Sequence, residues 1–202
     1  MSTAAPVRRG RPRLVSPATA LEPREEILRE ASRLFSARGV PGTRLSDIAA
    51  AVGITPSTIY YHFDNLAAIV EALLTYVVDE SAAFATVSAR RDGPCADRLG
   101  ALVTQHVERL TTGPYDLWFV VGLSEDPPHR YPAVSRKARE WRRAVARLVT
   151  EGIDRGELHP IDVTLAVAAV SGLVHAALEL RHDGVPVDPT EVARLAVAAL
   201  RQ

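Results

Sequence analysis

Apolar side chains recur at helical spacing along most of the chain after residue 23. In the first such segment they follow the i, i+3, i+4, i+7 repeat of an amphipathic helix, which Gly39 should end. These positions are Ile27, Leu28, Ala31, Leu34 and Phe35. The same repeat, interrupted by Gly and Pro, predicts further helices over 45–52, 56–63, 66–89, 96–111, 115–123, 133–154, 162–182 and 189–201. No segment alternates as a strand would, so the sequence predicts an all-α fold of about nine helices.

Residues 45–63 contain two short predicted helices joined by a tight turn at Gly53. Glycine has no Cβ and takes a positive φ at low cost. Thr55 suits the cap of the second helix and Pro56 its first position. This arrangement is typical of a helix-turn-helix, whose second helix lies in the DNA major groove. An ordinary helical hairpin with a capped second helix is the alternative.

The second helix of this motif carries mainly hydroxyl and imidazole side chains. Such groups can form hydrogen bonds with phosphate oxygens or with base edges. The candidates are Thr55, Ser57, Thr58, Tyr60, Tyr61 and His62.

The spacing over about residues 24–75 closely resembles the N-terminal domain of the tetracycline-repressor (TetR) family. The matching positions are Ile27, Leu28, Ala31, Leu34, Phe35, Gly39, Thr43, Asp47, Ile48, Ala49, Val52, Gly53, Ile54, Thr55, Ser57, Thr58, Ile59, Tyr60, His62 and Phe63. The resemblance implies a one-component transcription regulator. It further implies a three-helix DNA-binding domain, a long connecting helix, and a helical C-terminal domain that binds ligand and dimerises. We expect the DNA-binding domain over 24–70 and the C-terminal domain over 71–202.

The resemblance also assigns DNA contacts by position. These are Thr43, Thr55, Ser57, Thr58, Tyr60 and His62, and we add Arg44, Pro56 and Tyr61 as further candidate contacts. Two positions depart from the family pattern. Leu66 stands where the family usually has a phosphate-binding Lys, and Arg44 stands where a small hydroxyl residue often caps the second helix. Arg44 either replaces the lost charge contact or is a solvated surface residue.

Residues 1–23 contain four prolines and few large apolar side chains, and they are expected to form a flexible basic arm. The stretch from Arg9 to Arg13 reads Arg-Gly-Arg-Pro-Arg and resembles the AT-hook core. Narrow A·T minor grooves attract Arg, so Arg9, Arg11 and Arg13 are candidate DNA contacts. A disordered solubilising tail is the alternative.

Composition supports a globular protein: hydrophobic residues make up 47%, and 24 basic residues balance 24 acidic ones. Cys95 is the only cysteine, which excludes an internal disulfide and a Cys-based zinc site. The N-terminus lacks the apolar region of a secretory signal. The apolar stretch over 163–178 is shorter than the roughly 20 residues that span a bilayer. We therefore expect a cytoplasmic protein with a buried helix at 163–178.

The predicted helix over 162–182 is apolar on nearly all faces, which indicates burial on all sides. A partner subunit is the simplest cover for the second face, and the last two helices of two subunits would form a four-helix interface. TetR-type proteins dimerise in this way. The expected interface residues are Val167, Val170, Ser171, Val174, Leu178, Leu195 and Ala199. A buried core helix in a monomer is the alternative.

A ligand site is expected among aromatic and polar residues of the middle helices, although residues of this kind are more often part of a core than of a ligand site. The candidates are His106, Tyr115, Trp118, Phe119, Trp141 and His175. Their character favours an apolar or aromatic effector. His175, Glu179 and His182 share a helix face, but an interface or helix-end role is favoured there over a metal. No metal or other cofactor is predicted.

The combined hypothesis is a ligand-responsive repressor that binds a palindromic operator as a homodimer and is released by a small molecule. An enzyme is the second class considered. The sequence lacks a Gly-x-Ser-x-Gly elbow, a phosphate-binding Gly-rich loop and a His-Glu-x-x-His helix, so catalysis is not expected. A helical interaction module that no longer reads DNA is the third.

Overall fold

The computed structural model describes residues 22–123 and 130–201. Within these ranges the chain forms nine helices and no strand, as the sequence predicts. The helices are α1 (Pro23–Arg38), α2 (Leu45–Val52), α3 (Pro56–His62), α4 (Leu66–Ser88), α5 (Cys95–Thr111), α6 (Phe119–Gly122), α7 (Pro132–Asp154), α8 (Val163–His182) and α9 (Pro189–Ala198).

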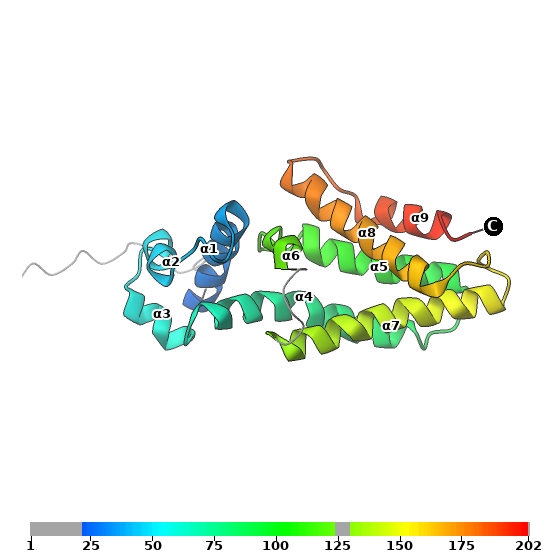
Figure 1. The fold of residues 1–202 in the computed structure, drawn as a ribbon, viewed down its shortest axis with the longest axis horizontal. Coiled ribbons are helices and arrows are strands. Elements are labelled where there is room, and N and C mark those ends of the chain that lie inside the picture. The colour runs from blue at the N-terminus through cyan, green and yellow to red at the C-terminus, as the bar shows by residue number, and fades with distance from the viewer. Residues whose placement is uncertain (1–21, 124–129, 202) are drawn as a thin grey trace, which may run out of the picture.

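Helices α1 to α3 form a small bundle at one end of the molecule, and α4 extends from it into a larger bundle (Figure 1). At 23 residues, α4 is roughly 35 Å long at 1.5 Å per residue. It packs along α7 and α5, while α5 also packs against α9 and α8. Ile69 and Leu73 of α4 are fully buried, so this helix belongs to the core of the molecule. Because α4 contributes to both bundles, it joins them mechanically.

The helix ends in the small bundle lie where Gly and Pro predict them. Pro23 opens α1 and Pro56 opens α3, where the missing N–H of proline has no intrahelical partner to lose. Gly53 ends α2 with φ 78° and ψ 33°, the left-handed conformation that glycine adopts most easily. Thr55 caps α3, and its Oγ1 accepts the amide N–H of Thr58 at 3.4 Å. Both predictions for this turn are confirmed.

Helix α6 is shorter than the predicted 115–123 because the residues before it form other hydrogen bonds. The amide of Asp116 donates to Ser32 Oγ of α1 at 3.1 Å, and the Asp116 carboxylate accepts the amide of Trp118 at 3.2 Å. A side chain that captures nearby amides in this way competes with the helix. Ser36 of α1 donates to the Asp116 carbonyl at 3.3 Å and accepts the Phe119 amide at 3.2 Å. These bonds fasten the start of α6 to α1.

Helix α8 is buried on one face only in the single chain, so the alternative of a helix buried on all sides within a monomer is wrong. Only 28% of its apolar stretch is buried, and Leu165 is 60% exposed. By length and composition alone the helix could cross a membrane, but core helices of water-soluble proteins meet the same criterion. Val170, Val174 and Leu178 are buried inside the chain's own fold. Their assignment to a dimer interface is therefore corrected: they are buried within the single chain, where α8 packs against α5, α7 and α9.

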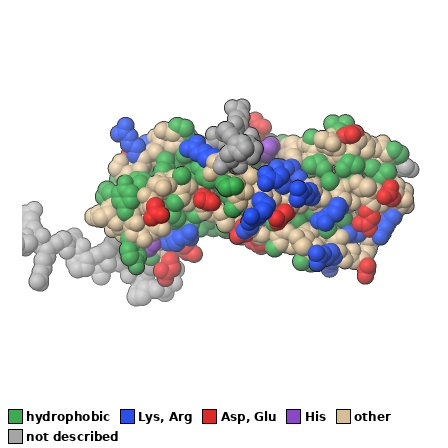
Figure 2. Space-filling model, turned by 60° about the horizontal axis from the view of Figure 1, so that its bottom comes forward, with side chains coloured by type: hydrophobic (Ala, Val, Ile, Leu, Met, Phe, Trp, Pro, Cys, Tyr) green, Lys and Arg blue, Asp and Glu red, His purple; other side chains and the backbone are tan. Residues whose placement is uncertain are grey.

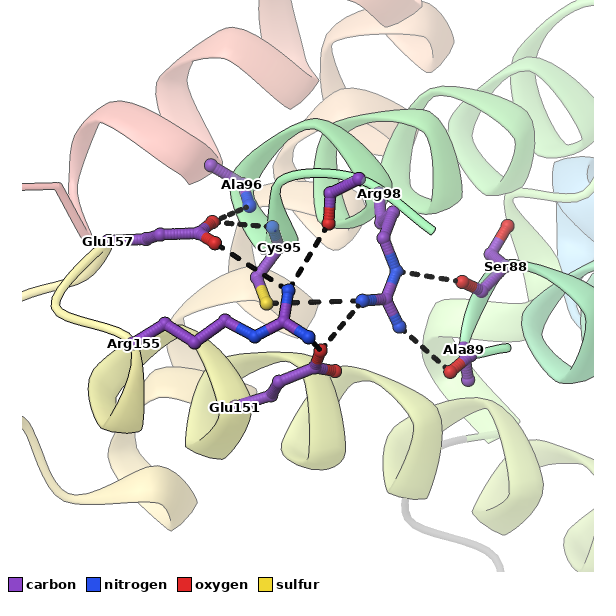
Figure 3. A network of polar contacts seen from close by, with 9 residues as sticks. Ser88, Ala89, Cys95, Ala96, Arg98, Glu151, Arg155 and Glu157 are labelled. Carbon is purple, nitrogen blue, oxygen red and sulfur yellow. Dashed lines mark hydrogen bonds and ion pairs between the residues drawn. The ribbon is translucent and has the colours of Figure 1, made fainter. Parts of the chain in front are cut away.

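A nearly buried arginine ties α4, α5 and α7 together (Figure 3). Arg98 of α5 is 8% exposed and donates to the carbonyl oxygens of Ser88 at 3.1 Å and Ala89 at 2.8 Å, where α4 ends. It also donates to the carboxylate of Glu151 on α7 at 2.9 Å. This hydrogen bond, more than any other effect, holds the pKa of Glu151 below its usual value. Burial raises the pKa of the neighbouring Cys95 thiol.

Candidate nucleic-acid interface and ligand cavity

Helix α3 presents polar and aromatic side chains outward while one residue anchors it. Ile59 is fully buried, whereas Tyr60 is 58% exposed and Tyr61 is 85% exposed. The ring of Tyr61 lies edge-on against His62, with centroids 5.0 Å apart. Two exposed tyrosine rings on one short helix are unusual unless a partner covers them, because each ring leaves apolar surface in contact with water.

The start of α3 carries a cluster of hydroxyl groups held at fixed spacing. Thr55 Oγ1 lies 2.7 Å from Ser57 Oγ and 2.9 Å from Thr58 Oγ1. Each hydroxyl can donate or accept, so the cluster can present either role to a phosphate or a base edge. Pro56, beside it, is also exposed. The structure therefore brings together Thr55, Pro56, Ser57, Thr58, Tyr60, Tyr61 and His62 on one helix.

Two predicted DNA contacts, Thr43 and Arg44, lie outside α3 and differ in their exposure to solvent. Thr43 is 3% exposed and its Oγ1 donates to the Gly39 carbonyl at 2.9 Å. Its side chain closes the loop between α1 and α2 and is not presented to DNA, so that assignment is corrected. Arg44 is exposed, and its amide donates to the Asp47 carboxylate at 3.0 Å. Asp47 thus satisfies a free amide at the start of α2 where Arg44 lacks a capping hydroxyl.

Leu66, which replaces the usual Lys of the family, is half-buried at the first position of α4. It lines a cavity of about 610 Å³ between α1 and α6, together with Phe35 and Phe119. This placement explains an apolar residue here, because a Lys ammonium would need to reach out of that cavity to stay hydrated. Arg9, Arg11 and Arg13, the predicted contacts of the arm, lie outside the described residues.

A second cavity, of about 210 Å³, lies inside the large bundle between α4, α5, α6, α7 and α8. We call it the bundle cavity. Its lining combines apolar side chains with two histidines, a tryptophan and two basic residues. The lining residues are Val77, Val78, His106, Leu110, Val120, Lys137, Ala138, Trp141, Arg142, Ser171, Val174, His175 and Leu178.

The bundle cavity contains three of the six predicted ligand residues: His106, Trp141 and His175. Trp118 and Phe119 line the cavity between α1 and α6 instead. Tyr115 lines neither of these two cavities, and its ring packs edge-on against Tyr76 with centroids 4.8 Å apart.

Sequence reasoning missed Lys137 and Arg142, and it placed Ser171, Val174 and Leu178 at a dimer interface when they line this cavity. The available signal was the run of basic residues along α7, interrupted by Trp141.

The polar groups of the bundle cavity are partly satisfied by the protein. Nδ1 of His106 lies 2.8 Å from Ser81 Oγ, and its ring packs on Trp141 with centroids 4.5 Å apart. Burial, reinforced by the nearby His175, lowers the pKa of His106 to about 4. His106 is therefore neutral at pH 7. In the part of the chain that the structure describes, no group of three His, Cys, Asp or Glu residues could hold a metal.

Both halves of the chain match one family of proteins. Residues 27–73 match the family described as bacterial regulatory proteins, tetR family. Residues 92–202, more than half of the chain, match the family described as tetracyclin repressor-like, C-terminal domain.

Among curated proteins, the regulator TtgR of Pseudomonas putida is 49% identical over 55 residues, which cover 27% of this chain and 26% of TtgR. The chain thus matches about a quarter of the length of the curated relatives.

Solved structures match over most of the chain. AmtR of Mycobacterium smegmatis is 30% identical, covers 91% of this chain and 87% of its own, and superposes with a TM-score of 0.76. AibR, solved with isovaleryl coenzyme A and operator DNA, is 20% identical, covers 89% and 98% of the two chains, and has a TM-score of 0.70. AibR shares the fold. The two family matches and the AmtR likeness establish more: the chain belongs to the TetR family of bacterial transcriptional regulators.

Proposed function

We propose that the protein is a ligand-responsive repressor that binds a palindromic operator as a homodimer and works in the cytoplasm. The observation that carries the DNA-binding part is the outward face of α3, where two exposed tyrosines adjoin the hydroxyl cluster. Burial of Ile59 fixes the orientation of this face. AibR, which has the same fold, was solved with both an acyl coenzyme A and operator DNA. Family membership favours this reading over an enzyme.

The contacts between α6 and α1 supply a route from ligand to DNA. Val120 of α6 lines the bundle cavity, and Ser32 and Ser36 of α1 hold the start of α6 through three hydrogen bonds. Phe119 packs edge-on against Phe35 of α1, with ring centroids 5.4 Å apart. A ligand that displaces α6 would therefore shift α1 and, with it, α3, the recognition helix of the helix-turn-helix. Such a ligand releases DNA only as far as it prefers the DNA-free geometry.

Replacing Tyr60 by alanine is expected to weaken operator binding about tenfold, because one exposed contact to DNA is lost while the core is unchanged. A gel shift with the DNA upstream of the protein's own gene, against an excess of unrelated duplex, measures this effect. Val185→Ala, an exposed change far from α3 in the chain, is the matched control and should bind as the unaltered protein does. If the unaltered protein shifts no upstream duplex specifically, the proposed function is wrong. An unchanged affinity in Tyr60→Ala contradicts the assigned contact.

The exposed face of α8 supports the proposed dimer. Leu165, Ala169, Gly172 and Ala176 recur at three- or four-residue spacing and are all exposed. Apart from the backbone of α8 itself, no atom of the described residues lies within 4 Å of the position that a Cβ would take at Gly172. Small residues let two helices approach closely. Leu195 of α9 is also exposed, which extends the apolar surface onto the neighbouring helix. Two such surfaces related by a twofold axis would form a four-helix interface.

Ala169→Arg is expected to convert the dimer into a monomer, because the long charged side chain enters the centre of the proposed interface. Sedimentation velocity measures the change in mass. Ala133→Arg, at an exposed position of α7, is the matched control and should remain dimeric. A dimer that persists in Ala169→Arg would place the interface elsewhere. The monomer should also lose operator affinity, since two recognition helices must meet major grooves about 34–36 Å apart.

A further inference from the structure

The bundle cavity contains a nearly buried hydrogen-bond donor that the protein leaves unused. Trp141 is 6% exposed, and its indole N–H has no partner within residues 22–123 and 130–201. A buried donor without a partner carries a free-energy cost, because its hydrogen bond to water is lost and not replaced. Trp141 is among the residues that line the cavity, which places this N–H beside the space that a ligand would occupy. This cost is consistent with a ligand site rather than with a core position alone.

His106 offers a second donor to the same cavity. The only hydrogen-bond partner of the Ser81 hydroxyl, among the described residues, is Nδ1 of His106. If Nδ1 carried the hydrogen, the buried hydroxyl of Ser81 would have no acceptor. Ser81 therefore donates to Nδ1, and the hydrogen of the neutral imidazole lies on Nε2. In the described part of the chain the hydrogen bond of the His106 ring is made through Nδ1, so Nε2 is available to an acceptor.

The charge around the cavity favours an anion over a neutral acceptor. Lys137 and Arg142 line it, and none of its described lining residues is Asp or Glu. Lys137 is paired with Asp79, so Arg142 supplies the net positive charge at the rim. Between residues 132 and 147, helix α7 carries six basic residues and a single acidic one, Glu140. Lys and Arg side chains gather near the middle of the face shown in Figure 2, as expected for a surface that attracts anions.

The volume limits the size of the occupant. An engineered apolar cavity of about 150 Å³ in another protein binds benzene. The bundle cavity, at about 210 Å³, therefore has room for one ring and one small substituent. Exposed Arg142 shows that the cavity reaches the surface on the α7 side.

We propose that the bundle cavity binds a compact organic acid, the size of benzoate, with its carboxylate accepting from Trp141 Nε1 and His106 Nε2. The apolar ring lies against Val77, Leu110 and Val174, which line the same cavity. This inference rests on the proposed function, because it names the class of effector for that regulator. It narrows the expected apolar or aromatic effector to one that also carries a negative charge.

The test is calorimetric titration of the purified full chain with sodium benzoate, and separately with benzamide, at pH 7. Benzamide has nearly the same shape but no charge. We expect benzoate to bind at least about tenfold more tightly, the effect of one hydrogen bond to a charged group. Equal or tighter binding of benzamide would overturn the assignment of an anion. If no benzoate binding is detected even at millimolar concentrations, the proposal as a whole is overturned.

Trp141→Phe retains one aromatic ring but removes the N–H together with the five-membered ring of the indole, and it is expected to weaken benzoate binding about tenfold. Trp118→Phe, in the cavity between α1 and α6, is the matched control and should leave affinity unchanged. Arg142→Ala is exposed, so it tests the charge at the rim without risk to the core, and roughly a two- to threefold loss is expected. Unchanged affinity in Trp141→Phe would contradict the proposed hydrogen bond. The titrations contain no DNA, so their failure is separable from failure of the gel shift, which contains no benzoate.

Discussion

Arg98→Ala is expected to lower the free energy of unfolding by about 2–4 kcal/mol, because carbonyl oxygens at the end of α4 lose their donor, while the Glu151 carboxylate retains its ion pair with Arg155. The carbonyl oxygens of Ser88 and Ala89 and the carboxylate of Glu151 all lose a hydrogen bond at once (Figure 3). These acceptors lie at the point where α4, α5 and α7 meet. Urea unfolding followed by circular dichroism measures the loss, with protein concentration held constant because a dimer unfolds at a concentration-dependent midpoint.

Two further variants separate the network from the charge of Arg98. Arg98→Lys retains the positive charge but offers a compact ammonium in place of the planar fork, so an intermediate loss is expected. Arg33→Ala removes an exposed ion pair with Glu30, which contributes about 0.5 kcal/mol or less. If Arg98→Ala destabilised the protein no more than Arg33→Ala, the network would not hold these helices together.

Much of the fold could be predicted because its helix ends are marked by residues with special backbone properties. Pro23, Gly53 and Pro56 set the bounds of α1 to α3 within a residue or two. Helix α6 could not be predicted in the same way. Its shortening depends on Asp116 bonding to Ser32, 84 residues away in the chain, and no local pattern reveals such a contact.

The residue types of the candidate DNA face could be predicted from the sequence, but which of these residues are exposed could not. The outward hydroxyls and tyrosines of α3 follow from a short helix with one apolar anchor. Thr43 has the same chemistry as Thr55, yet a local backbone hydrogen bond buries it in the loop. Likewise, the sequence pattern places Val174 and Leu178 on an outward face, because both faces of α8 are apolar. Which face turns inward depends on where α5 and α7 pack, and periodicity alone does not contain that information.

Acidification from pH 6.5 to pH 4 is expected to remove about 3 kcal/mol of stability through His106 alone. Its pKa in the folded chain is lowered to about 4 by burial and by His175, while an unfolded histidine titrates near 6.5. The groups that face it are Ser81 from α4, Trp141 from α7 and His175 from α8. In this pH window His106 is protonated in the unfolded chain but still largely neutral in the native chain. The free energy of unfolding therefore falls as the pH falls. The loss is complete below the folded pKa.

His106→Gln provides the control for this effect, since glutamine has an amide that can bond Ser81 but does not titrate. The variant is expected to be less stable than the unaltered protein at pH 7, because glutamine replaces the packed ring on Trp141. Its free energy of unfolding should nevertheless fall less steeply between pH 6.5 and 4. The pH profiles of this free energy for the variant and for the unaltered protein should therefore converge at low pH. Other acid-sensitive groups are common to both proteins and cancel in the difference. Parallel pH profiles would show that the imidazole of His106 is protonated as readily in the native bundle as in the unfolded chain.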